Sequence, residues 1–368
     1  MPLTFVAPGG RTARNLFRDE DFAEQRAFFA ARPNLQPTPL HLFPAQARRL
    51  GLAQLSIKDE TRRFGLNAFK AVGATFAIAT LKARGLIRPG ATLACASEGN
   101  HGRAVARSAR LEGCSAVVYV ADSVARARVV AIELEGATVQ RVAGTYDDAV
   151  RSMLGDAARE QWTIISDTSW AGYEDIPRLI MLGYTRLLDE VESQSSSPTD
   201  VIFVQAGVGG LLAATACWAN WRYGNQRPSI VAVEPLSAAC VQASVRANAP
   251  TVVGGPFETI MGGLRCGEMS PIAFDVIRSI VDGYIAVEDQ WAREAMRRLA
   301  LPAGGDPQIE AGASGAASLA GLLATLGDPA ADGLREALKL SGNSRVLVIA
   351  TEGVTDPDGF AAVLDDGS

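Results

Sequence analysis

Residues 58–80 read KDETRRFGLNAFKAVGATFAIAT, and they place a lysine at the start of a helix made largely of small residues. Asn67 is a favourable N-cap residue. Apolar residues recur after it at helical spacing, at Phe69, Val72, Phe76 and Ala79. Lys70 therefore falls in the first helical turn, where unpaired amide N–H groups and the positive end of the helix dipole disfavour a cation. The position is unusual for a lysine with a purely structural role.

The flanks of Lys70 favour burial over the solvated surface position that most lysines occupy. Ala68 and Phe69 precede it, and Ala71 and Val72 follow it. Burial lowers the pKa of a lysine and yields a neutral amine, which is the nucleophile that forms an imine with an aldehyde. We therefore expect Lys70 to be the lysine of a pyridoxal-phosphate site, with a solvated surface lysine as the alternative.

Length and composition indicate an ordinary globular protein. The chain has 368 residues, of which 20% are charged and 48% hydrophobic, so it can bury a sizeable core in one or two domains. The net charge of −5 provides no basic surface for nucleic acid or for an anionic membrane. A small molecule is the expected partner.

The cysteines and the N-terminus favour a cytoplasmic location. Five cysteines, an odd number, show no CxxC spacing, which is typical of a reducing compartment and excludes an obvious zinc site. The first residues contain no charged start followed by an apolar run, and no stretch reaches the roughly 18 apolar residues of a membrane span. We expect no metal and no membrane contact.

Short apolar strands alternate with helices along most of the chain. One alternation runs from the strand at 92–96 to the strand at 163–165. After a helix at 176–192 and a polar linker at 193–200, a second begins with the strand at 201–205 and closes with the strand at 345–350. Such alternation predicts two parallel α/β layers.

A glycine-rich loop follows the strand at 201–205. It contains Ala206, Gly207, Val208, Gly209 and Gly210. Backbone amides without nearby Cβ atoms can surround a phosphate there, and the helix N-terminus favours its charge.

This loop has two alternatives to a single phosphate site. One is a plain glycine turn. The other is a dinucleotide fingerprint, in which Glu234, at the end of the next strand, would bind a ribose; that fingerprint requires glycine where this chain has Leu212. A single phosphate suits the loop better than a pyrophosphate.

Three further polar segments follow strands. The first is SEGNHG at 97–102, where Asn100 and the backbone amides could bind a phenolic oxygen and a carboxylate, and where His101 is either a packed or a catalytic histidine. The others begin after the strands at 163–165 and 345–350, and they contain Asp167, which could equally be a helix cap, and Thr351. Because ligands bind at the carboxyl ends of parallel strands, these segments should line one crevice.

Several strings together resemble a known family. PTPL at 37–40, KDETRRFGLNAFK at 58–70, SEGNHGR at 97–103 and QAGVGG at 205–210 resemble fold type II pyridoxal-phosphate enzymes, the group of threonine dehydratase and cysteine synthase. RFGLNAFK, DTSWAGYEDIP at 167–177, TIMGGLRCGE at 259–268 and TEGVTDP at 351–357 resemble diaminopropionate ammonia-lyase. The resemblance covers nearly all of the chain after residue 35.

This resemblance implies an α/β fold of two three-layer αβα sub-domains, each with a parallel sheet, and pyridoxal phosphate in the crevice between them. Residues 1–88 and 186–368 would form the larger, cofactor-binding domain, and residues 89–185 a smaller mobile one. The family also implies a homodimer.

The resemblance assigns roles to the matching residues. Lys70 would form the imine with the cofactor, Phe69 would contact it, and residues 206–210 would bind its phosphate. Asn100 would lie beside the ring hydroxyl and Thr351 against the pyridine nitrogen, where a hydroxyl leaves the ring a weak electron sink that suits β-elimination. The residues expected to bind the substrate are Ser97, Glu98, Gly99, His101, Asp167 and Tyr173.

The implied reaction is elimination of the β-amino group of 2,3-diaminopropionate. The substrate amine displaces Lys70, a base removes the α-proton, and the aminoacrylate that forms hydrolyses to pyruvate and ammonia. Asp167 matches the catalytic carboxylate linked to the L-isomer. Glu98 stands where relatives have the aspartate linked to the D-isomer, and its extra methylene shifts the carboxylate by on the order of 1 Å.

Other functions stay open at this stage. Glu98, together with Ala313 at a position where the family has glutamate, motivates a related β-eliminating enzyme for serine, threonine or 3-hydroxyaspartate-like substrates. A catalytically silent binding protein is a further alternative, which the presence of Lys70 and Asp167 disfavours. A nucleotide-binding oxidoreductase would rest on Gly207, Gly209 and Glu234 alone.

Overall fold

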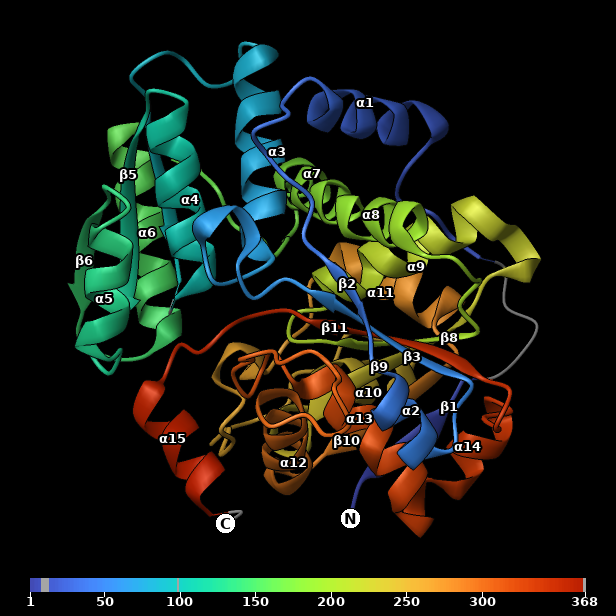
Figure 1. Cartoon of the computed structure of the whole chain (residues 1–368). Coiled ribbons are helices and arrows are strands. Elements are labelled where there is room, and N and C mark those ends of the chain that lie inside the picture. The colour runs from blue at the N-terminus through green and yellow to red at the C-terminus, as the bar shows by residue number, and fades with distance from the viewer. Residues whose placement is uncertain (8–12, 98, 367–368) are drawn as a thin grey trace.

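The computed structural model describes residues 1–7, 13–97 and 99–366 of the chain (Figure 1). Two sheets organise these residues. The larger sheet contains β1 (Leu3–Val6), β2 (Leu40–Leu42), β3 (Gln54–Asp59), β8 (Val201–Gln205), β9 (Ser229–Pro235), β10 (Gly283–Val287) and β11 (Arg345–Ala350). The smaller sheet contains β4 (Thr92–Ala96), β5 (Ser115–Ala121), β6 (Thr138–Val142) and β7 (Thr163–Ile164).

The strand orders confirm the predicted α/β class with parallel sheets. The large sheet runs β1-β10-β9-β8-β11-β3-β2, in which the five inner strands are parallel and the two edge strands, β1 and β2, are antiparallel to their neighbours. The small sheet runs β6-β5-β4-β7 and is parallel throughout. The sequence analysis did not foresee β1, because its four residues carry no alternating pattern.

Helices cover both sheets (Figure 1). In the first half of the chain they are α1 (Asp19–Ala30), α2 (Pro44–Leu50), α3 (Lys70–Ala83), α4 (Asn100–Leu111), α5 (Arg126–Glu133), α6 (Tyr146–Glu160), α7 (Asp175–Tyr184) and α8 (Arg186–Gln194). In the second half they are α9 (Gly210–Tyr223), α10 (Cys240–Ala247), α11 (Pro271–Ile280), α12 (Asp289–Ala300), α13 (Ala317–Gly327), α14 (Asp332–Ala337) and α15 (Pro357–Asp365). The single helix expected at 176–192 is thus two helices, which meet at Thr185.

Alternate residues of the large sheet enter two different apolar cores. On β8, Ile202 and Val204 join a core shared with α3, α7, α9 and α11, whereas Val201 and Phe203 join a core shared with α2, α12 and α13. The first core continues through α3 and α4 to one face of the small sheet. Because side chains of a strand alternate between its faces, this division gives the large sheet a helical layer on each side.

Helix α3 joins the two halves of the molecule, and it begins later than the sequence suggests. Its N-cap is Phe69 and its first residue is Lys70. The prediction that Asn67 caps it is wrong, because the Asn67 carbonyl accepts a hydrogen bond from the amide of Gly353 and Ala68 pairs with Glu352 in an antiparallel bridge. These contacts tie residues 67 and 68 to the loop at 352–353, so α3 begins only after them.

The crossing of α3 and α7 requires glycine. A Cβ added at Gly73 would lie 2.5 Å from Cε1 of Tyr184, and one at Gly183 would lie 2.8 Å from the Cα of Gly73. The close approach sets the position of α3, and therefore of Lys70, against the helix that follows the Asp167 loop.

Candidate active site

Lys70 and Asp167 form an ion pair at the start of α3. The amine of Lys70 donates a hydrogen bond to Oδ2 of Asp167, which joins the first residue of α3 to the loop after β7. Burial lowers the pKa of Lys70, but the Asp167 carboxylate more than offsets this, so that the pKa lies above the usual lysine value. The expected neutral amine is therefore wrong for this arrangement. The lysine is only partly buried, and the counterion reverses the effect of burial on its charge.

Asp167 lies in a loop that is fixed by aromatic side chains. The loop leaves β7, and its Trp170 and Tyr173 rings stack 4.1 Å apart. The Tyr173 hydroxyl accepts a hydrogen bond from the Ser166 amide at 2.8 Å and donates one to the Ile164 carbonyl at 2.9 Å. Tyr173 therefore fixes the backbone beside Asp167, and any contact it makes with a substrate would be through its ring.

The structure also decides between the two interpretations of Asp167. Helix α7 has Glu174 at its N-cap, so Asp167 does not cap it. Burial raises the pKa of Asp167, but the charges of His101 and Lys70 and the hydrogen bond from the lysine outweigh burial and lower it below the usual range. Asp167 is therefore held in its charged form, at the carboxyl end of a strand of the small sheet.

His101 lies beside the same carboxylate on α4. Its Nε2 contacts the Ile165 carbonyl at 2.8 Å, and its Nδ1 is 3.9 Å from Oδ2 of Asp167. Since a carbonyl only accepts, Nε2 carries a hydrogen and donates it. The Nε2 side of the ring thus packs against the backbone at Ile165, and the Nδ1 side lies near Asp167. A catalytic role of His101 stays a prediction.

The junction before α4 is organised by Ser97. Its hydroxyl accepts hydrogen bonds from the amides of Gly99 and Gly102, at 3.2 and 2.9 Å, which supports the first turn of α4. Glu98, the second predicted catalytic carboxylate, lies outside the described residues.

Asn100 reaches a carboxyl group that the sequence analysis did not select. Its Nδ2 donates a hydrogen bond to Oε2 of Glu352, which is buried at 7% exposure. Burial raises the pKa of Glu352 above the usual glutamate value, although the neighbouring Ser314, Arg128 and Asn100 favour its charged form. The string TEGVTDP contained the available signal, an acid next to the predicted cofactor residue Thr351.

Thr351 lies at the end of β11 with its hydroxyl oriented by Gln205. The amide Nε2 of Gln205 donates to Oγ1 of Thr351 at 2.6 Å and also approaches the Ile349 carbonyl at 3.1 Å. The threonine oxygen therefore accepts from Gln205, so its own proton can be donated elsewhere. Gln205 is a second residue of the site that the sequence analysis missed, although it precedes the glycine loop directly.

The glycine loop at 206–210 is packed too closely for larger side chains. A Cβ at Gly207 would lie 2.9 Å from Sγ of Cys266, and one at Gly209 would lie 2.9 Å from Cδ1 of Ile277. Gly209 has φ +89° and is the N-cap of α9. The first amides of a helix have no partner within it, so the loop presents N–H groups and no side chains to an anion.

Glu234 does not face this loop as a ribose ligand would. It is buried at 1% exposure and accepts hydrogen bonds from the amides of Val241 and Gln242 at 2.7 and 2.8 Å. Burial raises its pKa to about 8. The carboxyl group thus supports the start of α10, which removes the main argument for a dinucleotide site.

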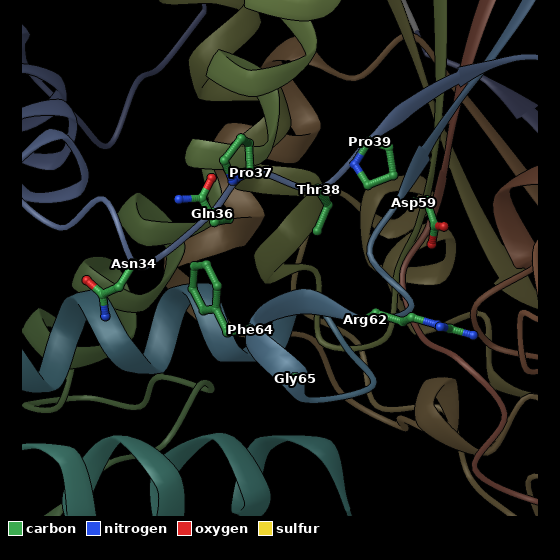
Figure 2. A pocket seen from close by; sticks show the side chains of 9 residues that line it. All are labelled: Asn34, Gln36, Pro37, Thr38, Pro39, Asp59, Arg62, Phe64 and Gly65. Carbon is green, nitrogen blue, oxygen red and sulfur yellow. The ribbon is translucent and has the colours of Figure 1, made fainter.

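A separate surface cavity of about 320 Å³ lies near the PTPL string. Figure 2 shows that two segments, 34–39 and 59–65, face one another around it. Its described lining residues are Asn34, Gln36, Pro37, Thr38, Pro39, Asp59, Arg62, Phe64 and Gly65. None of these is a predicted site residue, so we do not assign the cavity to the site around Lys70.

The described residues provide neither a metal-binding cluster nor a membrane-spanning helix. No group of three or more histidine, cysteine or acidic side chains is arranged to bind a metal ion there. Within the same residues, no helix is long and apolar enough to span a membrane.

Comparisons with known proteins agree with this geometry. A family model described as "Pyridoxal-phosphate dependent enzyme" matches residues 31–352. Diaminopropionate ammonia-lyase of Escherichia coli K12 is 36% identical, over 96% of this chain and 93% of that protein. Two crystal structures of the Escherichia coli enzyme, one with an aminoacrylate–pyridoxal-phosphate azomethine intermediate and one with D-serine, match with a TM-score of 0.91. Their identities are 34% and 33%, and each match covers 100% of this chain and 98% of the solved chain.

Proposed function

We propose, because the chain belongs to the diaminopropionate ammonia-lyase family of pyridoxal-phosphate-dependent enzymes, that it eliminates the β-amino group of 2,3-diaminopropionate to give pyruvate and ammonia. The observation that carries the proposal is the Lys70–Asp167 pair at a helix start, between the two sheets. It joins a nucleophilic amine to a proton acceptor. The chain is thus a carbon–nitrogen lyase, and 2,3-diaminopropionate is the proposed substrate.

The residues present fit pyridoxal phosphate. Lys70 supplies the amine, and the glycine loop at 206–210 with the first amides of α9 would bind the phosphate. The hydroxyl of Thr351 would donate a hydrogen bond to the pyridine nitrogen, since its oxygen already accepts a hydrogen bond from Gln205. When bound, the cofactor withdraws electrons from the α-carbon of an amino acid. Asn100 and Phe69 are proposed to contact the ring.

The protein's own part in catalysis is mainly proton handling. Lys70 must lose a proton before its nitrogen can act as a nucleophile or a base, and Asp167 is the carboxylate in contact with it. We propose that Lys70 and Asp167 together remove and hold the α-proton of the L-isomer. His101, 3.9 Å from Asp167, would stabilise that carboxylate while it is charged.

The two substrate isomers are proposed to react at different rates. Asp167 matches the family carboxylate linked to the L-isomer, whereas position 98 carries glutamate where the family has aspartate. A misplacement of about 1 Å can lower a rate by on the order of a hundredfold. We propose that the L-isomer is preferred, and that Ser97 and Gly99 contribute backbone and hydroxyl contacts to the substrate carboxylate.

A spectrum of the purified protein followed by substrate addition tests the function. We expect visible absorbance from bound cofactor that changes with L-2,3-diaminopropionate while pyruvate forms, and a slower change with the D-isomer. Pyruvate from serine or threonine, with none from either isomer of diaminopropionate, would instead favour a dehydratase.

Assembly and location are further proposals. We propose a homodimer, on the resemblance to fold type II enzymes alone, and light scattering of the eluting protein would test it. We propose a cytoplasmic location, which is supported by five cysteines that form no disulfide. Residues 89–185 are proposed to move relative to residues 1–88 and 186–368 when substrate binds, because Lys70 and Asp167 come from different units.

A further inference from the structure

Glu352 provides a second carboxyl group to the site, and its surroundings differ from those of Asp167. It follows β11, and its backbone pairs with that of Ala68, two residues before Lys70. Its Oε2 accepts a hydrogen bond from Asn100. A Cβ added at Gly263 or at Gly312 would lie 3.6 Å from one of its oxygens. The carboxyl is therefore enclosed by Asn100 on one side and by two glycines on the other.

The loop at 312–314 lies beside the Glu352 carboxyl. Gly312 and Ser314 both approach the carboxyl, and Ala313 stands between them in the chain. Ala313 carries no polar side chain. Glu352, in the neighbouring loop, thus places a carboxyl group near position 313, which itself has no acidic side chain.

The surroundings of the two carboxyl groups shift their pKa values in opposite directions. Asp167 contacts the Lys70 ammonium directly, and its pKa is lowered. Burial dominates at Glu352 and raises its pKa, while the charges of Arg128 and Lys70 oppose this only in part. Two titratable groups whose environments move their pKa values apart are typical of an acid and a base that work in one site.

We propose that Glu352 is the acid that protonates the leaving β-nitrogen and thereby sets the preference for an amine as leaving group. The inference rests on the proposed function. The Cα–H bond breaks, its proton goes to the base, and its electron pair becomes the second Cα–Cβ bond. The Cβ–N bond breaks and its pair leaves with nitrogen, which takes the Glu352 proton and departs as NH₃. Glu352 is left as a carboxylate that solvent reprotonates.

Substrates with different leaving groups test this role. Amide ion cannot leave without a proton, whereas chloride can, so 3-chloroalanine is the matched comparison for 2,3-diaminopropionate. In Glu352→Gln we expect kcat/KM to fall about 100-fold for diaminopropionate, a typical size for a lost general acid. For 3-chloroalanine we expect a fall of less than about threefold, because that step needs no acid.

A control variant separates this effect from the loss of any buried carboxyl. Glu234 is also buried and has a raised pKa, but it contacts the amides of α10. Glu234→Gln should leave the ratio of the two kcat/KM values unchanged. The visible absorbance and the dissociation constant of pyridoxal phosphate should match the wild type in Glu352→Gln, since the isosteric amide can still accept from Asn100.

The outcomes are distinct. Equal losses on both substrates in Glu352→Gln, or an altered cofactor spectrum, would show that Glu352 only positions Asn100 and would overturn the inference. If that variant does not fold, Glu352→Asp decides: an unchanged substrate ratio despite the shortened acid would count equally against it. A wild type that converts 3-chloroalanine but neither isomer of diaminopropionate would contradict the proposed function itself.

Discussion

Lys58 and Lys70 belong to one short stretch of sequence, yet they occupy opposite electrostatic situations. Lys58 has a fully buried side chain and donates to the Thr38 carbonyl and to Glu190, each at 2.6 Å. Burial lowers its pKa. The side chain of Lys70 is 24% exposed and meets the single carboxylate of Asp167, which raises its pKa.

The comparison shows that depth of burial does not identify the reactive lysine. Lys58 is surrounded by a network in which Arg63 contacts Glu60 and Glu190 at 2.5 and 2.7 Å. The ammonium of Lys58 has fixed hydrogen-bond partners, and Lys58 lies within strand β3. Lys70 lies at a helix start, where its counterion is the Asp167 carboxylate. The reactivity of a lysine therefore depends on the groups that its amine contacts, and not on its burial alone.

Replacement of Lys70 should have the largest effect. In Lys70→Ala we expect kcat to fall by at least about 10³-fold, since the nucleophile and a base are lost together. The cofactor's visible absorbance should change, as measured on the purified variant. Activity close to that of the wild type would show that Lys70 has been misassigned.

Replacement of Lys58 should affect stability and not chemistry. Lys58→Met leaves Glu190 short of one cation, and breaking a buried pair costs about 3–5 kcal/mol. Urea unfolding should show this loss, while kcat per folded molecule stays within about twofold. A large fall in kcat with unchanged stability would erase the distinction between the two lysines.

Removal of the Asp167 charge should make Lys70 resemble Lys58. Without its counterion, burial dominates and the pKa of Lys70 falls, so more neutral amine is present at a given pH. We expect Asp167→Asn without cofactor to capture added pyridoxal phosphate faster at pH 7 than the wild type, as followed by absorbance. The kcat for L-2,3-diaminopropionate should fall about 100-fold. Slower capture would mean that Asp167 activates the amine in some other way.

The smallest effect concerns Tyr184, whose buried hydroxyl lies beside Lys70 without a hydrogen bond of normal geometry. Tyr184→Phe should change the free energy of unfolding by less than about 1 kcal/mol, because no bond is lost. Tyr284→Phe is the matched control: that buried hydroxyl donates to the Ile277 carbonyl at 3.1 Å, and its loss should cost about 1 kcal/mol. Denaturant titration of both variants measures the difference.

The parallel sheets and the polar segments at their strand ends could be predicted because each depends on local pattern. Apolar strands of about five residues and glycine-rich turns are visible in the chain, and motifs located Lys70, Asp167 and Thr351. The prediction of an N-cap at Asn67 failed for a tertiary reason, since the backbone of residues 67 and 68 pairs with the loop at 352–353.

Contacts between distant segments could not be predicted in this way. Asn100 meets Glu352, and Lys58 meets Glu190, across separations of 252 and 132 residues. The sign of the pKa shift at Lys70 depends on such a contact, because the flanking residues indicate burial but not the counterion. From the flanking residues alone, the pKa of Lys70 is expected to fall, whereas the contact with Asp167 raises it.

The place of β11 in the large sheet has a consequence for biosynthesis. This strand, the last in chain order, lies between β3 and β8, and Thr351 and Glu352 follow it directly. A nascent chain from which Lys70 and the glycine loop have already emerged still lacks β11, an inner strand of the large sheet. Capture of pyridoxal phosphate should therefore follow the synthesis of β11, close to the end of translation.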